Sequence, residues 1–370
     1  MEQPLRSTSL LRRVLRTSLL LLLTALVILP LVSGEARFLV RSAWEEARIL
    51  LGRRPLQELI ADSATPADRR SQFELVLAAR AFAAERLGLS AGDTYTTFSD
   101  IGKGTTLVHV LSASPKDRLA GYKWSYPIVG AVPYKGFFDE EAARTEMRRL
   151  ERLGYDTYLR PAGAFSTLGW FNDPLLSTAL DDDPVDLVVT VIHEIAHNTL
   201  WVPGDVRFNE SYANFVGFRG AQMFFASRGD QEAARRCAAM WRDEKRLGAF
   251  YTDLEDDLLG LYGSGLPRPE IERRRAGIFA RARAALRNLG LEVYDGSRLA
   301  RSPIDNARVI AKRIYLTGLD EFDKMYDAKS GDLRAGIQEI ERSLKSNPSL
   351  SAMEVLAVVA RSGSIPRQAG

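Results

Sequence analysis

At 370 residues the chain is long enough to bury a sizeable core, as one large domain or two moderate ones. Its 50 Lys and Arg residues nearly balance its 47 Asp and Glu residues, so the charge gives no support for nucleic-acid binding. A single cysteine, Cys237, excludes an internal disulfide framework.

Residues 1–36 are typical of an export signal. Four arginines precede an uncharged run over residues 17–34, and small residues close it. The run is longer than most cleavable signal cores and shorter than a full membrane span. Basic residues on the cytoplasmic side would leave the rest of the chain outside. We therefore predict a single-pass anchor in the cytoplasmic membrane, with a cleaved signal peptide as the alternative. Glu35 occupies the position of a lipoprotein cysteine, which excludes lipidation there.

Residues 37–225 are predicted to form a helical part followed by an α/β part. Apolar residues at helical spacing favour helices between residues 38 and 88. Runs rich in β-branched and aromatic residues then predict strands. These runs are residues 94–98, 105–111, 126–134 and 157–160. Between the last two, Asp139 is expected to cap a helix that ends near Leu153.

A buried helix is predicted from Asp183 to about residue 201. Asp183 suits the cap, Pro184 suits the first helical position, and the run that follows is too apolar for a surface helix. The helix contains His193, Glu194 and His197, which form the H-E-x-x-H pattern. Residues four apart share a helix face, so both imidazoles can bind one metal ion. The alternative is two core histidines with an accidental Glu between them.

The next helix offers a third ligand. A turn signal at residues 203–205 follows His197, and Asn209 is then a suitable N-cap for a helix that continues to Met223. Glu210 in its first turn can face the two histidines. Two His and one carboxylate, with the fourth position left to water, form the ligand set of a catalytic zinc site. Asn214, one turn further, could accept a hydrogen bond from the far nitrogen of a ligating His.

Residues 226–361 are predicted to be almost wholly helical, and residues 362–370 to form a tail. The expected helices cover residues 231–247, 270–289, 305–317 and 333–344. The whole chain is therefore assigned to the α+β class: an N-terminal membrane helix, a small mixed or antiparallel sheet region, and a largely helical C-terminal half.

Several blocks resemble a bacterial family of putative aminopeptidases. They are residues 124–130 (WSYPIVG), 134–138 (YKGFF), 164–174 (AFSTLGWFNDP), the H-E-x-x-H helix and 204–210 (GDVRFNE). More broadly, H-E-x-x-H followed by N-E-x-x-A is similar to the gluzincin arrangement of zinc metallopeptidases. The resemblance implies a zincin-like fold and a bacterial envelope protein, with the chain in the periplasm.

Two further sets of residues are implied by this resemblance. In similar peptidases an edge strand beside the metal helix binds the substrate backbone by strand addition. Here that strand would consist of Phe165, Ser166, Thr167, Leu168, Gly169 and Trp170, although a purely structural strand end explains the pattern equally well. Gluzincins often use a Tyr or His to stabilise the oxyanion, and no His follows His197. Tyr315 is our choice, with Tyr251, Tyr262 and Tyr326 as competitors.

The sequence thus predicts a zinc-dependent peptide-bond hydrolase. Zn²⁺ held by His193, His197 and Glu210 would bring the pKa of a bound water to near 7. Glu194 would take the water's proton and pass it to the leaving amine. Two other functions stay open: a non-catalytic membrane-anchored envelope protein with a structural zinc, and a zinc amidase that acts on non-peptide or cell-wall substrates. Exo- and endopeptidase action are not distinguished, and neither is the oligomeric state.

Overall fold

The computed structural model describes residues 34–102, 108–126, 130–162, 174–180 and 183–361. The predicted anchor and the predicted substrate strand over residues 165–170 lie outside these ranges. The chain divides into two units, and the first ends at Gly52. In the first unit the structure describes one helix, α2 (Gly34–Leu51), and the following account concerns the second, residues 53–370. Across the described ranges, no helix has the length and apolar character needed to cross a membrane.

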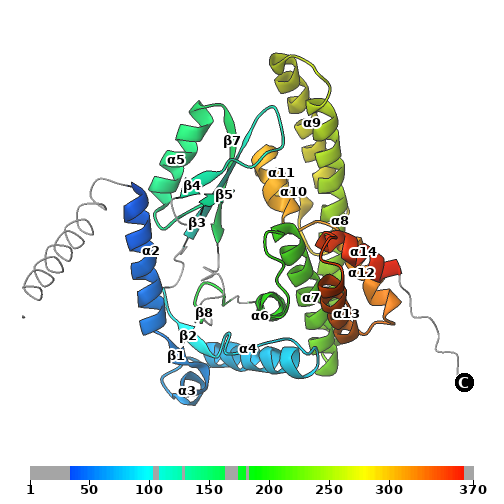
Figure 1. Cartoon of the computed structure of the whole chain (residues 1–370). Helices are drawn as coiled ribbons and strands as arrows, with labels where there is room; N and C mark the ends of the chain where they lie inside the picture. The colour runs from blue at the N-terminus through cyan, green and yellow to red at the C-terminus, as the bar shows by residue number, and fades with distance from the viewer. Residues whose placement is uncertain (1–33, 103–107, 127–129, 163–173, 181–182, 362–370) are drawn as a thin grey trace, which may run out of the picture. The chain divides into compact units, whose positions relative to one another are not determined.

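The second unit combines short strands with many helices (Figure 1). Its strands are β1 (Arg54–Pro55), β2 (Thr97–Ser99), β3 (Val108–Pro115), β4 (Trp124–Tyr126), β5 (Gly130–Val132), β6 (Lys135–Phe137), β7 (Tyr155–Ala162) and β8 (Leu175–Leu176). Its helices are α3 (Leu56–Ala61), α4 (Ala67–Glu85), α5 (Glu140–Arg152), α6 (Pro184–Thr199), α7 (Val206–Ser227), α8 (Gln231–Tyr262), α9 (Arg268–Arg287), α10 (Gly296–Leu299), α11 (Asn306–Arg313), α12 (Leu319–Ala328), α13 (Leu333–Ser346) and α14 (Ala352–Arg361). The α+β class is therefore confirmed.

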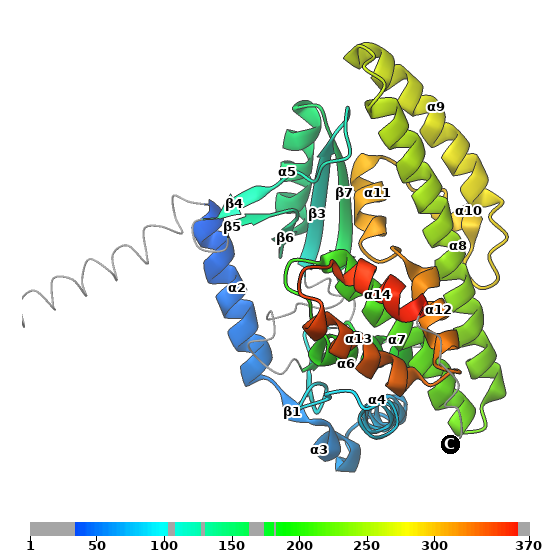
Figure 2. The same ribbon diagram turned by 45° about the vertical axis from the view of Figure 1, so that its right-hand side comes forward.

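Three small sheets carry the β structure. In one, β3 lies between β6 and β7 and pairs antiparallel with both. Helix α5 packs on one face of this sheet and α11 on the other (Figure 2). A small apolar core that includes Leu111 and Leu150 joins α5 to the sheet. In the other two, β4 pairs with β5, and β2 pairs antiparallel with β1 and parallel with β8. The prediction of small mixed and antiparallel sheets is confirmed.

Helix α6 begins as its sequence predicts. The Asp183 side chain accepts a hydrogen bond from the backbone N–H of Val185, and Pro184 is the first residue of the helix. The apolar residues after it are buried against α4 and α7. Gly217 on α7 makes close packing possible, because a Cβ there would lie 3.0 Å from the Val189 carbonyl oxygen and 3.2 Å from His193 Cβ. The backbone of α7 can therefore approach the face of α6 that carries His193.

The start of α7 differs from the prediction that Asn209 caps it. The cap is Asp205, whose side chain accepts a hydrogen bond from the Phe208 N–H, so Asn209 lies inside the helix. Its amide instead bonds back to Val202: Oδ1 accepts from the Val202 N–H at 2.8 Å, and Nδ2 donates to the Val202 carbonyl at 2.9 Å. Two Asx residues competed for one cap, and the one nearer the turn occupies it. Asn209 fixes the turn between α6 and α7.

The C-terminal helices also differ in length from the predicted ones. Helix α8 continues to Tyr262 instead of ending near Leu247. Gly248 does not stop it, because this glycine faces Leu316 and Leu319, where a Cβ would lie 3.4 Å from the Leu316 carbonyl oxygen. Helices α12 and α14 were not predicted, because both are short and gain their stability by packing on each other and on α13. The predicted boundary after residue 225 falls in the last turn of α7, and α7 packs against α8 within the second unit.

Candidate metal centre

Three side chains from α6 and α7 converge. His193 Nε2 lies 3.2 Å from His197 Nε2, and Glu210 Oε2 lies 3.4 Å from His193 Nε2 and 3.7 Å from His197 Nε2. Each side chain is largely buried, with 13%, 16% and 18% of its surface exposed respectively. The helix turn places His193 and His197 on one face of α6, and the α6–α7 turn brings Glu210 opposite them. The structure therefore brings together the three residues that the sequence singled out as metal ligands.

These separations fit a tetrahedral metal ion. Ligand atoms placed tetrahedrally about 2.0–2.1 Å from zinc lie about 3.3 Å from one another. The three observed separations cluster around that value. Among the described residues, this is the one group of three or more His, Cys, Asp or Glu side chains whose ligand atoms all lie within 4.8 Å of one another. Two imidazoles and one carboxylate also match the donor set of catalytic zinc sites, which leave one position open.

The contact between His193 and Glu210 shifts the pKa of both groups. Burial alone would lower the pKa of His193, but the Glu210 carboxylate and the nearby Glu194 charge reverse the effect and raise it. Burial would likewise raise the pKa of Glu210, whereas hydrogen bonds from both histidines lower it to about 2. The carboxylate is therefore ionised and faces ring nitrogens, which is the state needed to bind a divalent cation.

Glu194 and Tyr315 lie beside this group. The Glu194 charge raises the pKa of both His193 and Tyr315, so it lies near both side chains. Tyr315 follows α11 and is brought to the site by the packing of α11 between β7 and α8. Burial and the Glu210 charge raise the pKa of the Tyr315 phenol to about 12, so it keeps its proton at neutral pH. A protonated phenol and a carboxylate thus both adjoin the metal-binding face.

The chain matches the model of one protein family. A model of the family described as "Putative aminopeptidase" matches residues 37–355, which include every group described above. The chain belongs to this family. Comparisons with curated proteins and with solved structures gave no match. Membership of a family of aminopeptidases supports peptide-bond hydrolysis as the general activity.

In this family member, Asn214 supports the metal-binding face as well as the loop after α11. Its side chain lies near His193 and raises the pKa of that imidazole, while Nδ2 donates a hydrogen bond to the Tyr315 carbonyl oxygen at 3.2 Å. Asn214 therefore acts on His193. Within the described ranges, Nδ1 of His197 is buried and makes no hydrogen bond. Among the described residues, a neighbouring amide thus supports His193, whereas Nδ1 of His197 has no such partner.

The four tyrosines considered from sequence occupy different places. Tyr262 donates a hydrogen bond to Asn306 Oδ1 at 2.7 Å, Tyr251 contacts Arg308, and Tyr326 packs against Phe215 and Arg219. Of the four, only Tyr315 has a pKa that the Glu194 and Glu210 charges shift. The surroundings of Tyr315 therefore suit an oxyanion donor better than those of the other three tyrosines. Its role as that donor stays a prediction.

Two residues near the site were not recognised from sequence. The guanidinium carbon of Arg160, on β7, lies 5.9 Å from the centroid of the Tyr315 ring. This guanidinium also affects the pKa of the Tyr315 phenol. Trp201 follows α6, is 50% exposed, and packs edge-on against His197 with ring centroids 5.6 Å apart. Arg160 is 155 residues from Tyr315 in the sequence and belongs to no recognisable motif, so no sequence signal could have identified it. Trp201 had a local signal, because it lies only four positions after His197, at the predicted end of the helix.

Proposed function

We propose that the chain is a zinc-dependent peptidase that acts outside the cytoplasm of a bacterial cell. The convergence of His193, His197 and Glu210 next to Glu194 carries this proposal. Membership of the aminopeptidase family supports the peptide substrate. The export signal read from residues 1–36 supports the location, either on a membrane anchor or free in the periplasm.

The three ligands would hold Zn²⁺ and leave one coordination position open. When bound, zinc supplies Lewis-acid polarisation of the scissile carbonyl and lowers the pKa of water. Glu194 acts as general base towards the attacking water and then delivers the proton to the leaving amine. Tyr315, protonated at neutral pH, donates a hydrogen bond to the developing oxyanion. Arg160 holds the phenol in place from β7, and Trp201 forms an apolar wall beside His197.

Glu194→Gln is the decisive variant. The amide keeps the size of the side chain but has no basic oxygen to accept the proton. We expect the variant to retain zinc and to lose at least about a hundredfold in turnover. Zinc is measured by elemental analysis of the purified protein, and turnover with a peptide library, before and after treatment with a chelator. Glu232→Gln, at an exposed position on α8, is the matched control and should keep both properties.

Other outcomes separate the remaining functions. Undiminished turnover in Glu194→Gln contradicts the role of this residue. Wild-type protein that contains zinc but cleaves no peptide contradicts a peptidase, and cell-wall fragments tested in parallel then distinguish an amidase from a structural zinc protein.

A further inference from the structure

A cavity of about 220 Å³ lies between α7, α8 and α11, beside the candidate metal centre. Leu247, Leu299, Leu316 and Tyr251 form the apolar part of its wall, which is about as large as the polar part. Glu244 on α8 and Lys312 on α11 also line it, and both remain partly exposed. A cavity that combines apolar side chains with a few charged groups is typical of a small-molecule site.

The two charges influence each other across the cavity without direct contact. Within the described part of the chain, Glu244 and Lys312 form no ion pair, and the Lys312 ammonium makes no hydrogen bond. Burial raises the pKa of Glu244 and lowers the pKa of Lys312, so the surroundings disfavour both charged forms. Opposite charges held apart in an apolar wall are costly unless a ligand pairs with them.

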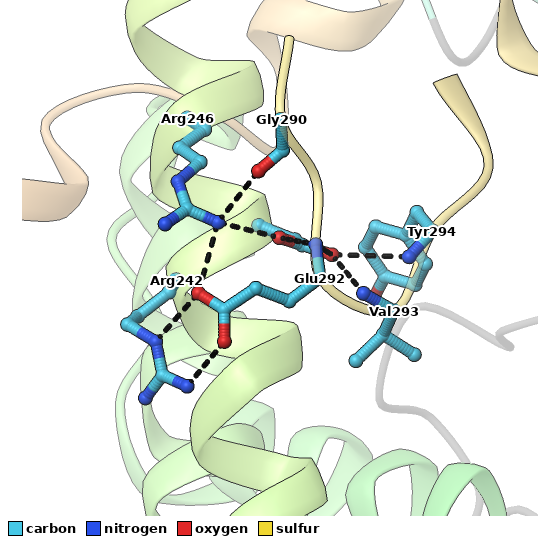
Figure 3. A network of polar contacts seen from close by, with 7 residues as sticks. Arg242, Arg246, Gly290, Glu292, Val293 and Tyr294 are labelled. Atoms are coloured by element: carbon cyan, nitrogen blue, oxygen red, sulfur yellow. Dashed lines mark hydrogen bonds and ion pairs between the residues drawn. The ribbon is translucent and has the colours of Figure 1, made fainter. Parts of the chain in front are cut away.

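Glu244 is held in place by a rigid neighbour. The adjacent Asp243 is fully buried, and its carboxylate accepts hydrogen bonds from the backbone N–H groups of Glu292, Val293 and Tyr294 at 2.7–3.0 Å. Arg242 and Arg246 bind the Glu292 carboxylate and complete the network (Figure 3). The fixed loop presents Tyr294, whose side chain lies close enough to Glu244 to affect the pKa of both groups. The backbone beside Glu244 is therefore fixed before any ligand arrives.

Part of the cavity wall is shared with the candidate metal centre. Asn214 and Tyr315 both line the cavity, and Asn214 joins the Tyr315 carbonyl to His193. A molecule in the cavity would therefore touch residues that orient a metal ligand and the candidate oxyanion donor.

We propose that this cavity binds the ammonium–carboxylate pair of an α-amino acid, with Glu244 accepting hydrogen bonds from the ammonium and Lys312 donating to the carboxylate. A cation alone would leave Lys312 unpaired, an anion alone would leave Glu244 unpaired, and a neutral molecule would pair neither. The volume equals that of roughly seven liquid waters, at about 30 Å³ each, which suits one amino acid. The leucines of the wall favour an apolar side chain.

The same chemistry has two possible sources. One is a free amino acid, which is the product of an aminopeptidase. The other is the zwitterionic end of a substrate side chain, as in an acylated diaminopimelate. The binding itself does not depend on the proposed peptidase activity, so it can be tested without turnover.

The experiment is calorimetric titration of the full chain with three probes of similar size. L-Leucine carries both charges, N-acetyl-L-leucine lacks the ammonium, and L-leucinamide lacks the carboxylate. We expect L-leucine to bind at least tenfold more tightly than either analogue. Because a free amino acid also chelates metal ions, the titration is repeated on chelator-treated protein, where the preference should persist. Acylated diaminopimelate, titrated in parallel, distinguishes the second source.

Variants locate the binding in the cavity. Glu244→Gln should abolish the preference for L-leucine over the N-acetyl analogue, and Lys312→Met the preference over the amide. Leu299→Trp should fill the cavity and remove binding. Exposed Glu232→Gln and Lys345→Met are the matched controls and should bind as the wild type does.

Three results would overturn the proposal. They are equal affinity for the three probes, no binding heat with any zwitterionic probe, and loss of binding on chelation alone. The wild-type comparison stands even if a variant fails to fold. Absent hydrolysis with intact zwitterion binding would contradict the peptidase proposal only.

Discussion

Two buried carboxylates on neighbouring helices have opposite surroundings. Asp243 on α8 accepts hydrogen bonds from three successive backbone N–H groups and from Arg246 at 3.2 Å. Glu210 on α7 faces two imidazole nitrogens at 3.4 and 3.7 Å. Backbone N–H groups are permanent donors, whereas each imidazole nitrogen is a donor only when it is protonated.

The difference separates a structural carboxylate from a candidate metal ligand. Asp243 is fully satisfied by the fold and needs no other partner. Glu210 faces two titratable ring nitrogens, a group that could hold a metal ion in place of protons. Both side chains are largely buried, so burial does not distinguish them. The type of hydrogen-bond donor around each carboxylate does.

The strongest test of this comparison removes the satisfied carboxylate. Asp243→Ala leaves three buried backbone N–H groups without an acceptor, and we expect the free energy of unfolding to fall by about 3 kcal/mol. Urea unfolding followed by circular dichroism measures the change. The zinc content of the folded protein should stay that of the wild type. A drop in zinc with unchanged stability would reverse the roles assigned to the two carboxylates.

The matching variant alters the ligand carboxylate. Glu210→Gln keeps the side-chain size but removes the negative charge that a divalent cation requires. We expect zinc affinity to weaken at least about a hundredfold, which corresponds to about 2.8 kcal/mol. Competition with a chromophoric chelator measures the affinity, and Asp243→Ala is the control for a general effect of losing a buried acid. Unchanged affinity would remove Glu210 from the ligand set.

The smallest effect is expected at Asn214. Asn214→Ala removes the polar side chain that acts on His193, and such supporting contacts are worth about 10- to 100-fold in metal affinity. We expect about a tenfold loss by the same competition assay. Asn198→Ala is the control, because Asn198 lies next to His197 but bonds Thr94 instead of a ligand. An equal loss in both variants would point to a general disturbance of α6.

Local patterns in the sequence predicted the central helix well. The cap at Asp183, the proline after it and the H-E-x-x-H spacing all depend on neighbours within a few residues, and each predicted feature of α6 appears in the structure. The approach of Glu210 to the two histidines was also predictable, because one short turn joins α6 to α7. The start of α7 could not be predicted in this way, because Asp205 and Asn209 were both suitable N-caps. Only the hydrogen bonds of Asn209 to Val202 show which of the two is not the cap.

Features that depend on distant segments could not be predicted. Arg160 meets Tyr315 only because β7 packs against α11, and Glu244 shares a cavity with Lys312 although 68 residues separate them. Residue type and spacing carry no information about such pairs. The strand proposed for substrate binding lies outside the described residues, and its role stays a prediction.

The turn that Asn209 fixes has a consequence for assembly. His193, His197 and Glu210 all belong to one helical hairpin, and only 12 residues separate the second histidine from the glutamate. Contacts so close in the chain form early during folding, before remote segments meet. We therefore expect metal to bind the nascent hairpin and to favour its native pairing, so that the ion would act as a folding template as well as a chemical reagent.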